Sequence, residues 1–167
     1  MSHVEHRSTA PISTRCGILT ISDTRTEETD TSGRLILDLL TANGHNVIAR
    51  QIIPDEPDQV RVAVQNQLIN PALQVIIATG GTGISSRDNS FEVIDALLQK
   101  RLVGFGELFR VLSYEEIGSA AILSRACAGT FDGKVILSLP GSERAVHLAM
   151  TKLILPELGH LIREASR

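Results

Sequence analysis

The chain has 167 residues, 43% of them hydrophobic and 21% charged, which suits one ordinary domain with a substantial core and excludes a disordered class. A net charge of -3 and 3% aromatic residues provide neither the basic surface nor the stacking side chains typical of nucleic-acid binding, and no basic amphipathic stretch favours a membrane partner. Cys16 and Cys127 form neither a disulfide framework nor a zinc motif. With no leader or long apolar span, we expect a cytoplasmic protein.

The expected elements alternate along the chain. Residues 1–14 are polar and predict a flexible N-terminal arm, and residues 15–167 predict a single α/β domain. Apolar, β-branched runs predict strands at residues 17–22, 46–53, 73–79 and 134–139. Helical spacing appears at residues 32–43, 57–70, 90–100, 104–114 and 142–165, the last with a kink or restart at Pro156. Residues 128–133 predict a turn. This order favours a three-layer sandwich, a mostly parallel sheet with helices on both faces.

A glycine-rich loop follows the third expected strand, where residues 79–88 read TGGTGISSRD. Its glycines permit positive φ angles and leave backbone amides unobstructed, which favours an anion-binding nest; a flexible surface loop is the alternative. A P-loop is excluded because no lysine follows Gly83, and a dinucleotide fingerprint because Ser86 stands where it needs glycine. The loop residues expected to bind a phosphorylated ligand are Thr79, Gly80, Gly81, Thr82, Gly83, Ser85 and Arg87.

The other strand ends also carry small, hydroxylated or acidic residues. Ligands of open α/β sheets bind beyond the carboxyl ends of the strands. The candidates there are Ser22, Asp23, Pro140, Gly141 and Ser142. Helix capping explains Ser142 equally well. Glu107 is a weaker candidate, since an acidic residue is also favoured at a helix start by the helix dipole.

Two carboxylates frame the glycine loop. Asp55 follows the second expected strand, and Asp88 ends the loop. Acidic groups beside a phosphate nest would repel the ligand unless a cation lay between them, so this pair favours a Mg²⁺–nucleotide complex. The alternative is that both residues cap helices or close turns. No histidine has metal-ligand spacing, and no nucleophile–histidine arrangement is recognisable from spacing.

Six segments resemble, in the same order, the molybdenum cofactor biosynthesis proteins of the MoaB/MogA type. They are TISD (20–23), IIPDE (52–56), TGGTGISSRD (79–88), GFGE (104–107), LSRACAG (123–129) and SLPGS (138–142). The resemblance extends from about residue 15 to the end of the chain, and residues 104–118 are similar to the MoaB branch.

The resemblance implies a molybdopterin-binding fold whose active members transfer AMP from Mg-ATP to the terminal phosphate of molybdopterin. It implies that Asp55 and Asp88 are the catalytic carboxylates and hold Mg²⁺. The implied contacts to pterin or nucleotide are Ser22, Asp23, Glu107, Ser124 and Ser142. It also implies a homo-oligomer, a trimer or hexamer, and other cofactor-assembly proteins as partners.

Two alternatives to this activity stay open. Some MoaB-type proteins lack adenylyl transfer, so one alternative is a non-catalytic molybdopterin carrier or scaffold of the same pathway. The other is an unrelated hydrolase of a nucleotide or sugar phosphate that uses the same nest and metal.

Overall fold

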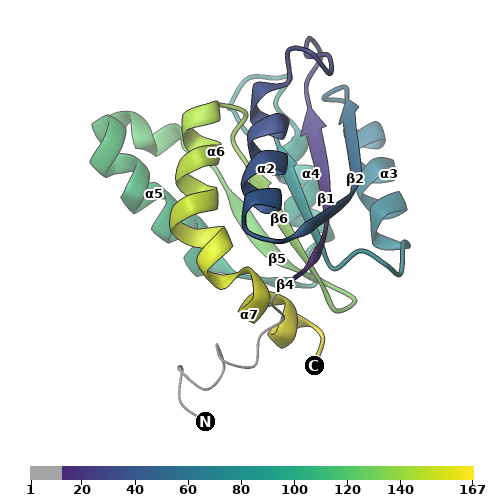
Figure 1. Cartoon of the computed structure of the whole chain (residues 1–167). Coiled ribbons are helices and arrows are strands. Elements are labelled where there is room, and N and C mark those ends of the chain that lie inside the picture. The colour runs from purple at the N-terminus through teal and green to yellow at the C-terminus, as the bar shows by residue number, and fades with distance from the viewer. Residues whose placement is uncertain (1–12) are drawn as a thin grey trace.

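A computed structural model describes residues 13–167, in which a six-stranded sheet has the order β2-β1-β3-β6-β5-β4 (Figure 1). β1, β2, β3 and β6 run parallel, whereas β5 is antiparallel to both of its neighbours. The strands are β1 Arg15–Ile21, β2 Asn46–Ile53, β3 Val75–Thr79, β4 Lys100–Arg101, β5 Cys127–Phe131 and β6 Lys134–Leu139. The predicted α/β class with a mostly parallel sheet is confirmed.

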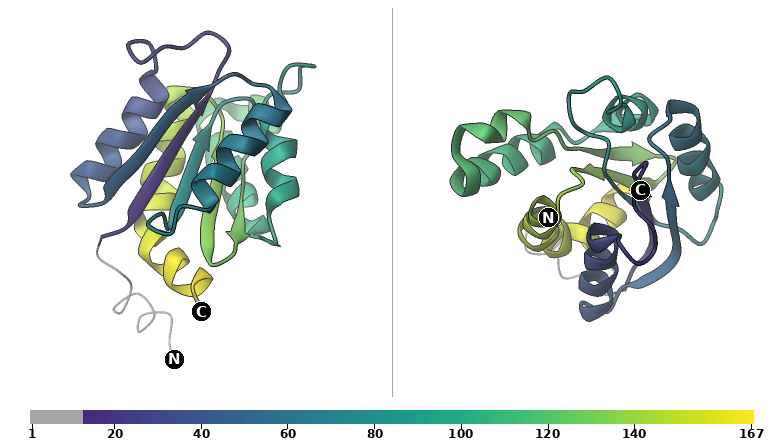
Figure 2. Two further views of the ribbon diagram at one scale, coloured as in Figure 1. Left: turned by 90° about the vertical axis from the view of Figure 1, so that its right-hand side faces the viewer. Right: turned by 90° about the horizontal axis from the view of Figure 1, so that it is seen from above.

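Helices cover both faces of the sheet (Figure 2). One face packs against α2 (Thr31–Ala42), α6 (Glu143–Ala149) and α7 (Leu155–Ala165). The other packs against α3 (Pro57–Leu68) and α4 (Ser90–Leu97). The long α5 (Val103–Ile117) continues into a 3₁₀-helix, η1 (Gly118–Leu123), and extends to one side of the sheet, where it contacts β5 and α6. The three-layer arrangement therefore leaves α5 and η1 at the periphery.

Each face of the sheet has its own apolar core. Along β3, Ile77 belongs to the cluster under α2, α6 and α7, whereas Ile76 and Ala78 belong to the cluster under α3 and α4. This alternation is the two-residue period of a strand. Because both faces are buried, the central strands are continuous apolar runs in the sequence.

The prediction of a turn over residues 128–133 is wrong for most of its length. Cys127–Phe131 forms β5, which pairs antiparallel with β6. Only Asp132 and Gly133 turn the chain, and both have positive φ angles, 45° and 78°. A two-residue Asp-Gly loop with this backbone matches the right-handed twist of a hairpin. The short strand β4 is likewise absent from the prediction. The helix was predicted to continue to residue 100, whereas α4 ends at Leu97 and the chain then enters β4.

The last helix restarts near Pro156, as predicted. α6 passes into a π-helical segment, Met150–Ile154, before α7 begins at Leu155. Proline lacks the amide that would continue the α-helical hydrogen bonds, so the preceding turn widens.

The predicted N-terminal arm, residues 1–14, lies almost wholly outside the described residues. Thr14 is buried, and its hydroxyl lies 3.1 Å from Nδ1 of His45. Among the described residues, no helix is both long and apolar enough to cross a bilayer.

Candidate functional site

A cleft of about 330 Å³ opens beyond the carboxyl ends of β1 and β3. Its wall comes from the segments that follow β1, β2, β3 and β6, together with the first turn of α2. The four strand ends singled out in the sequence therefore converge on one site. The lining residues are Thr20, Ile21, Ser22, Asp23, Thr24, Arg25, Ser32, Asp55, Thr79, Gly80, Gly81, Arg87, Asp88 and Gly141.

Most of the candidate site residues lie in or beside this cleft. Thr82, Gly83 and Ser85 continue the glycine loop beyond the lining, and Pro140 accepts a hydrogen bond of 2.9 Å from the Thr79 hydroxyl. Ser124, Pro140 and Ser142 line a neighbouring cleft of about 450 Å³, whose other walls are apolar and charged residues of α5, η1 and α6. Glu107 is exposed on α5 and lines neither cleft.

The first two glycines of the loop are required by close packing. Gly80 has a φ of 107°, and a Cβ there would lie 2.1 Å from the carbonyl oxygen of Ile21. Gly81 has a φ of 64°, and a Cβ there would lie 2.4 Å from Oδ2 of Asp55. Both angles favour glycine, and both contacts exclude a side chain. The loop thus approaches the ends of β1 and β2 as closely as its backbone allows.

The backbone amides of the loop are not equivalent. Gly80 N–H donates to the carbonyl of Leu139 at 3.0 Å and is therefore occupied. The amides of Gly81, Thr82 and Gly83 have no acceptor among residues 13–167. The sequence predicts an anion-binding nest in this loop, and successive unpaired amides are the hydrogen-bond donors that such a nest requires.

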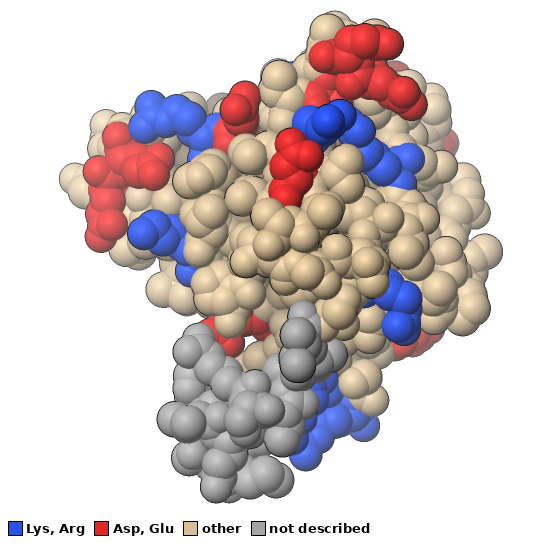
Figure 3. All heavy atoms as spheres, viewed as in Figure 1, with Lys and Arg blue, Asp and Glu red and all other residues tan. Residues whose placement is uncertain are grey.

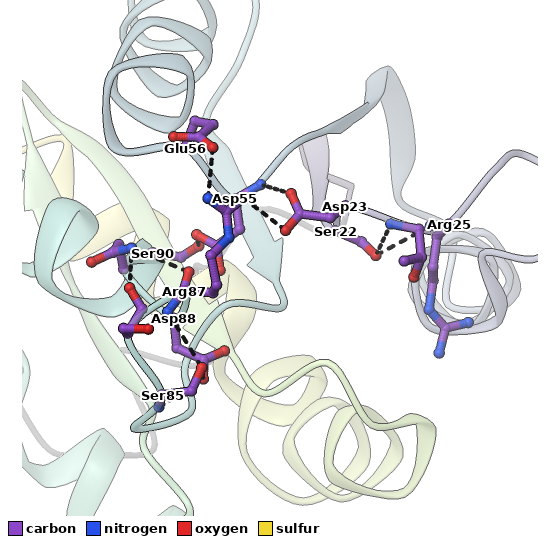
Figure 4. Close-up of polar contacts among 12 residues, drawn as sticks. Ser22, Asp23, Arg25, Asp55, Glu56, Ser85, Arg87, Asp88 and Ser90 are labelled. Carbon is purple, nitrogen blue, oxygen red and sulfur yellow. Dashed lines mark hydrogen bonds and ion pairs between the residues drawn. The ribbon is translucent and has the colours of Figure 1, made fainter.

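Asp55 is the most buried carboxylate of the cleft, with 6% of its surface exposed. Oδ1 accepts a 3.0 Å hydrogen bond from the Ser90 hydroxyl, and the Asp55 amide donates to Oδ1 of Asp23 at 3.0 Å (Figure 4). Burial raises the pKa of Asp55, and the charges of Asp88 and Asp23 add to this effect, while hydrogen bonds from the Ser90 hydroxyl and the Asn89 amide oppose it. The alternative role as a helix cap is not observed, because Glu56 occupies the N-cap of α3.

Arg87 crosses the mouth of the site and pairs with two acidic side chains. Its guanidinium lies 2.9 Å from Oδ2 of Asp23 and 2.8 Å from Oε1 of Glu56 (Figure 4). The hydrogen bond from Arg87 is the main reason that the pKa of Asp23 is lowered, and Asp23 in turn raises the pKa of Arg87. All three side chains are substantially exposed, so an entering ligand can exchange these partners.

Asp88 is held within the loop itself. Its Oδ2 accepts hydrogen bonds from the amide and the hydroxyl of Ser85, at 3.0 and 2.6 Å. A Cβ on Gly83 would lie 2.5 Å from the same oxygen. A local turn of this type is one of the alternatives considered from the sequence, and it coexists with a position on the cleft wall. Ser142 is the N-cap of α6, so its capping alternative is confirmed.

Several residues that organise the site are missing from the sequence prediction. Asp30 is buried at the N-cap of α2, where it accepts from the Gly33 amide, the Thr20 hydroxyl and Arg50, each at 2.9 Å. An aspartate followed by the Thr-Ser-Gly start of an apolar helix is a cap signal that could have identified it. Ser90 has no comparable local signal, and Arg125 lies in the segment LSRACAG, which does not indicate its partners because they lie far away in the sequence.

This fold and cleft define a class of protein: an α/β domain with a polar cleft beyond the carboxyl ends of its parallel strands, beside a glycine loop flanked by carboxylates. Residues 17–160 match the family model described as "Probable molybdopterin binding domain". The chain is 52% identical to molybdenum cofactor biosynthesis protein B of Bacillus cereus over 168 residues, which cover 100% of this chain and 99% of the relative.

Solved structures of proteins of the same kind have the same fold as this chain. A crystal structure of molybdenum cofactor biosynthesis protein B, 52% identical, has a TM-score of 0.91, with 94% of this chain and 98% of that one covered. The tungsten cofactor synthesizing protein MoaB from Pyrococcus furiosus, 37% identical, has a TM-score of 0.84, with 95% and 100% covered. The chain therefore belongs to the MoaB/MogA family of molybdenum cofactor biosynthesis proteins.

Proposed function

We propose that this protein binds molybdopterin and transfers AMP from Mg-ATP to its terminal phosphate. The observation that carries the proposal is the position of the buried carboxyl of Asp55 beside the unpaired amides of the glycine loop, with Asp23 and Asp88 on the same wall. Burial and like charges raise the pKa of Asp55. Carboxylates next to an anion-binding loop favour a bound cation, and hence a metal–nucleotide ligand.

The reaction suits a site without a histidine or other evident general base. An ionised oxygen of the pterin phosphate, whose second pKa is near ~6, attacks the α-phosphorus of ATP. The new P–O bond forms as the bond to the β-phosphate breaks, and pyrophosphate leaves with the electron pair. No proton has to be removed from the nucleophile. Positioning and charge stabilisation are then the main contributions of the protein, and the loop amides supply hydrogen-bond donors for both.

The acidic residues of the cleft fit a cation that enters with the nucleotide. Among residues 13–167, no group of three or more His, Cys, Asp or Glu side chains forms a complete metal site. Mg²⁺ commonly takes only one or two protein carboxylates and completes its shell with phosphates and water. Asp55 and Asp88 are the carboxylates that would hold it. The ion would neutralise the negative charge that accumulates on the reacting phosphates.

The neighbouring cleft offers a position for the pterin. It shares the turn after β6 with the main cleft, because Gly141 lines one and Pro140 and Ser142 line the other. Its walls combine apolar surface with the serines Ser124 and Ser142 and the charged Glu116, Glu143 and Arg144, and apolar walls with a few polar groups are typical of sites for small organic ligands. The pterin would then lie over α5 and α6, with its phosphate directed towards the glycine loop.

A non-catalytic molybdopterin carrier or scaffold is the second candidate. The observation that favours it is the pair of ion pairs that Arg87 makes, because they neutralise Asp23 and Glu56 without a metal ion. The glycine loop would then serve only to hold the pterin phosphate.

Mass spectrometry of the products separates the two candidates. Purified protein is mixed with molybdopterin, ATP and Mg²⁺, and adenylylated molybdopterin is measured for the wild type, Asp55→Asn and Asp88→Asn. Asp38→Asn is the control, because Asp38 is exposed on α2 and, among residues 13–167, pairs with the exposed Arg34. We expect product from the wild type and the control, and a rate lower by about 10²–10³ in each site variant. Saturable molybdopterin binding without product would support the carrier and contradict the transferase.

In this proposal, the protein is cytoplasmic and forms a homo-oligomer through an exposed hydrophobic surface. Of the eleven large hydrophobic side chains exposed among the described residues, seven lie on α5 and η1. They are Val103, Leu108, Val111, Tyr114, Ile117, Ile122 and Leu123. An apolar surface of this extent is typical of a contact between protein chains. A second copy of this chain is its proposed partner, in a trimer or hexamer; other cofactor-assembly proteins are also proposed partners.

A further inference from the structure

Arg125, in the segment between η1 and β5, is bonded to the glycine loop. Its Nε donates to the carbonyl of Thr82 at 2.8 Å, and Nη2 donates to the carbonyl of Gly83 at 2.5 Å. Nη1 donates to the carboxylate of Glu92, and the guanidinium lies 4.7 Å from the centre of the Phe91 ring. The planar, five-donor fork of arginine suits this combination of partners, which a point charge such as lysine cannot reproduce.

These bonds determine the direction of the loop amides. In a planar trans peptide the carbonyl and the following N–H point in opposite directions. Because Arg125 holds the carbonyl of Thr82, the amide of Gly83 points away from Arg125. The bond to the Gly83 carbonyl orients the amide of Ile84 in the same manner. Neither amide has an acceptor in the part of the chain that the structure describes.

The first turn of α4 completes the arrangement. The Ser90 amide donates to the carbonyl of Gly81 at 3.1 Å, which turns the amide of Thr82 away from that helix. Phe91 and Glu92, which hold Arg125, belong to the same turn. Three successive carbonyls are therefore bonded on the α4 side, and three successive amides are left on the opposite side of the loop.

We propose that Arg125 is a positioning residue that orients the glycine-loop amides towards the phosphate oxygens of the ligand. It lines neither of the two clefts, so it acts through the loop and not by contact with the ligand. The inference rests on the proposed function for the nature of the ligand, a phosphate group. Arg125 lowers the pKa of Glu92 through their hydrogen bond, so the pair stays ionised and the guanidinium stays in place at neutral pH.

The test compares Arg125→Gln with the wild type in two measurements. The first is calorimetric binding of inorganic pyrophosphate and of Mg-ATP. The second is amide hydrogen exchange of residues 81–88 without ligand. We expect binding weaker by about 10- to 100-fold and faster exchange confined to the loop, with little change in melting temperature. Arg125→Lys keeps the charge but should lose the same binding affinity, because one ammonium group cannot hold both carbonyls. If the glutamine variant does not fold, the lysine variant serves as the test.

Arg101→Gln is the matched control. Arg101 also bonds a carboxylate and a carbonyl, both of Asp95, but at the other end of α4. It should leave pyrophosphate binding and loop exchange unchanged. Three results would each overturn the inference. They are wild-type affinity for pyrophosphate in the Arg125 variants, wild-type rates of amide hydrogen exchange in their glycine loop, and a wild-type protein that binds no pyrophosphate. Pyrophosphate binding that depends on Arg125, in a protein that makes no adenylylated product, would support the inference and contradict only the transferase.

Discussion

Asp55 is stabilised by few partners for a carboxylate that is so nearly buried. The Ser90 hydroxyl and the Asn89 amide donate to its carboxylate, while Asp88 and Asp23 bring further negative charge. Burial raises its pKa, so the native state holds this proton at a pH where the unfolded chain has released it. When such a residue is ionised, it lowers the stability of the folded protein. Residues that bind a ligand commonly lower stability in this way while the ligand is absent.

Asp55→Asn should therefore stabilise the protein at neutral pH while it impairs the proposed reaction. The native proton of Asp55 favours folding below the ordinary Asp pKa of about 3.9, and this contribution is lost as the pH rises through the raised native value. We expect the melting temperature of Asp55→Asn at pH 7 to exceed that of the wild type by about 2–4 °C. The difference should shrink towards pH 4. A variant that is less stable than the wild type at every pH would contradict this account.

The contacts around Asp55 also show how far sequence reasoning reaches at the residue scale. Asp55, Asp88 and the glycine loop could be identified because each belongs to a strand end with a distinctive local composition. Ser90 and Arg125 were given no role, although Arg125 lies in the segment LSRACAG, because neither a helix start nor a single arginine indicates which distant residues it contacts. Their roles arise from partners 35 and 43 residues away, which only the folded chain brings together.

At the scale of elements, Asp30 joins β1, β2 and α2. It caps α2 and accepts hydrogen bonds from Thr20 on β1 and Arg50 on β2. Burial alone would raise its pKa, but the bonds from Arg50, Gly33 and Thr20 outweigh it and lower the pKa. Asp30 thus stabilises the folded state above the ordinary Asp pKa, and this stabilisation is lost as the pH falls towards the lowered native value.

Asp30→Ala should cost about 3 kcal/mol of unfolding free energy at pH 7, because it removes a helix cap and leaves Arg50 without its buried partner. Urea denaturation at pH 7 and pH 3 measures this cost, which should be smaller at the lower pH. Asp38→Ala on the same helix breaks an exposed pair with Arg34 and should change stability by less than about 0.5 kcal/mol. Equal effects of the two substitutions would contradict the role given to Asp30.

The sequence interpretation predicted β6 but missed β5, its partner in the hairpin, although a signal was present. The dipeptide Asp132-Gly133 between two β-prone runs is a strong hairpin indicator. β5 itself, CAGTF, contains small residues that resemble a loop in isolation. Gly129 is nevertheless required there, because a Cβ would lie 2.3 Å from the carbonyl oxygen of Lys100 on the neighbouring strand. The strands of the central sheet were predicted because burial on both faces makes them uniformly apolar.

Gly133→Ala should destabilise this hairpin by about 1–2 kcal/mol, because the residue has a φ of 78° that an L-residue with a Cβ adopts at a cost. Gly133→Asn should cost less, since asparagine tolerates the left-handed region. Chemical denaturation of both variants measures the difference. The turn assignment would be contradicted if alanine were tolerated as well as asparagine.

At the scale of the whole molecule, the cleft and the flank formed by α5 and η1 occupy different parts of the surface. Acidic and basic groups are interspersed on the face shown in Figure 3, with a broad uncharged area between them. The cleft lies at the carboxyl ends of the strands, whereas α5 and η1 project from the side of the sheet beyond β5 and α6 (Figure 1). A neighbouring chain bound to this flank would lie next to the apolar cleft that Ser124 and Ser142 line, because α5 and η1 form one wall of it.

Charge placed on this flank should therefore dissociate the proposed oligomer. The double variant Leu108→Glu, Val111→Glu alters two side chains that are 55% and 58% exposed, so each chain should still fold. Light scattering after gel filtration should give a multiple of the 18.0 kDa chain mass for the wild type and a single chain for the variant. Val62→Glu, on α3 and 53% exposed, is the control and should keep the wild-type mass. A monomeric wild type, or a double variant with unchanged mass, would contradict the assignment of this surface to a second copy.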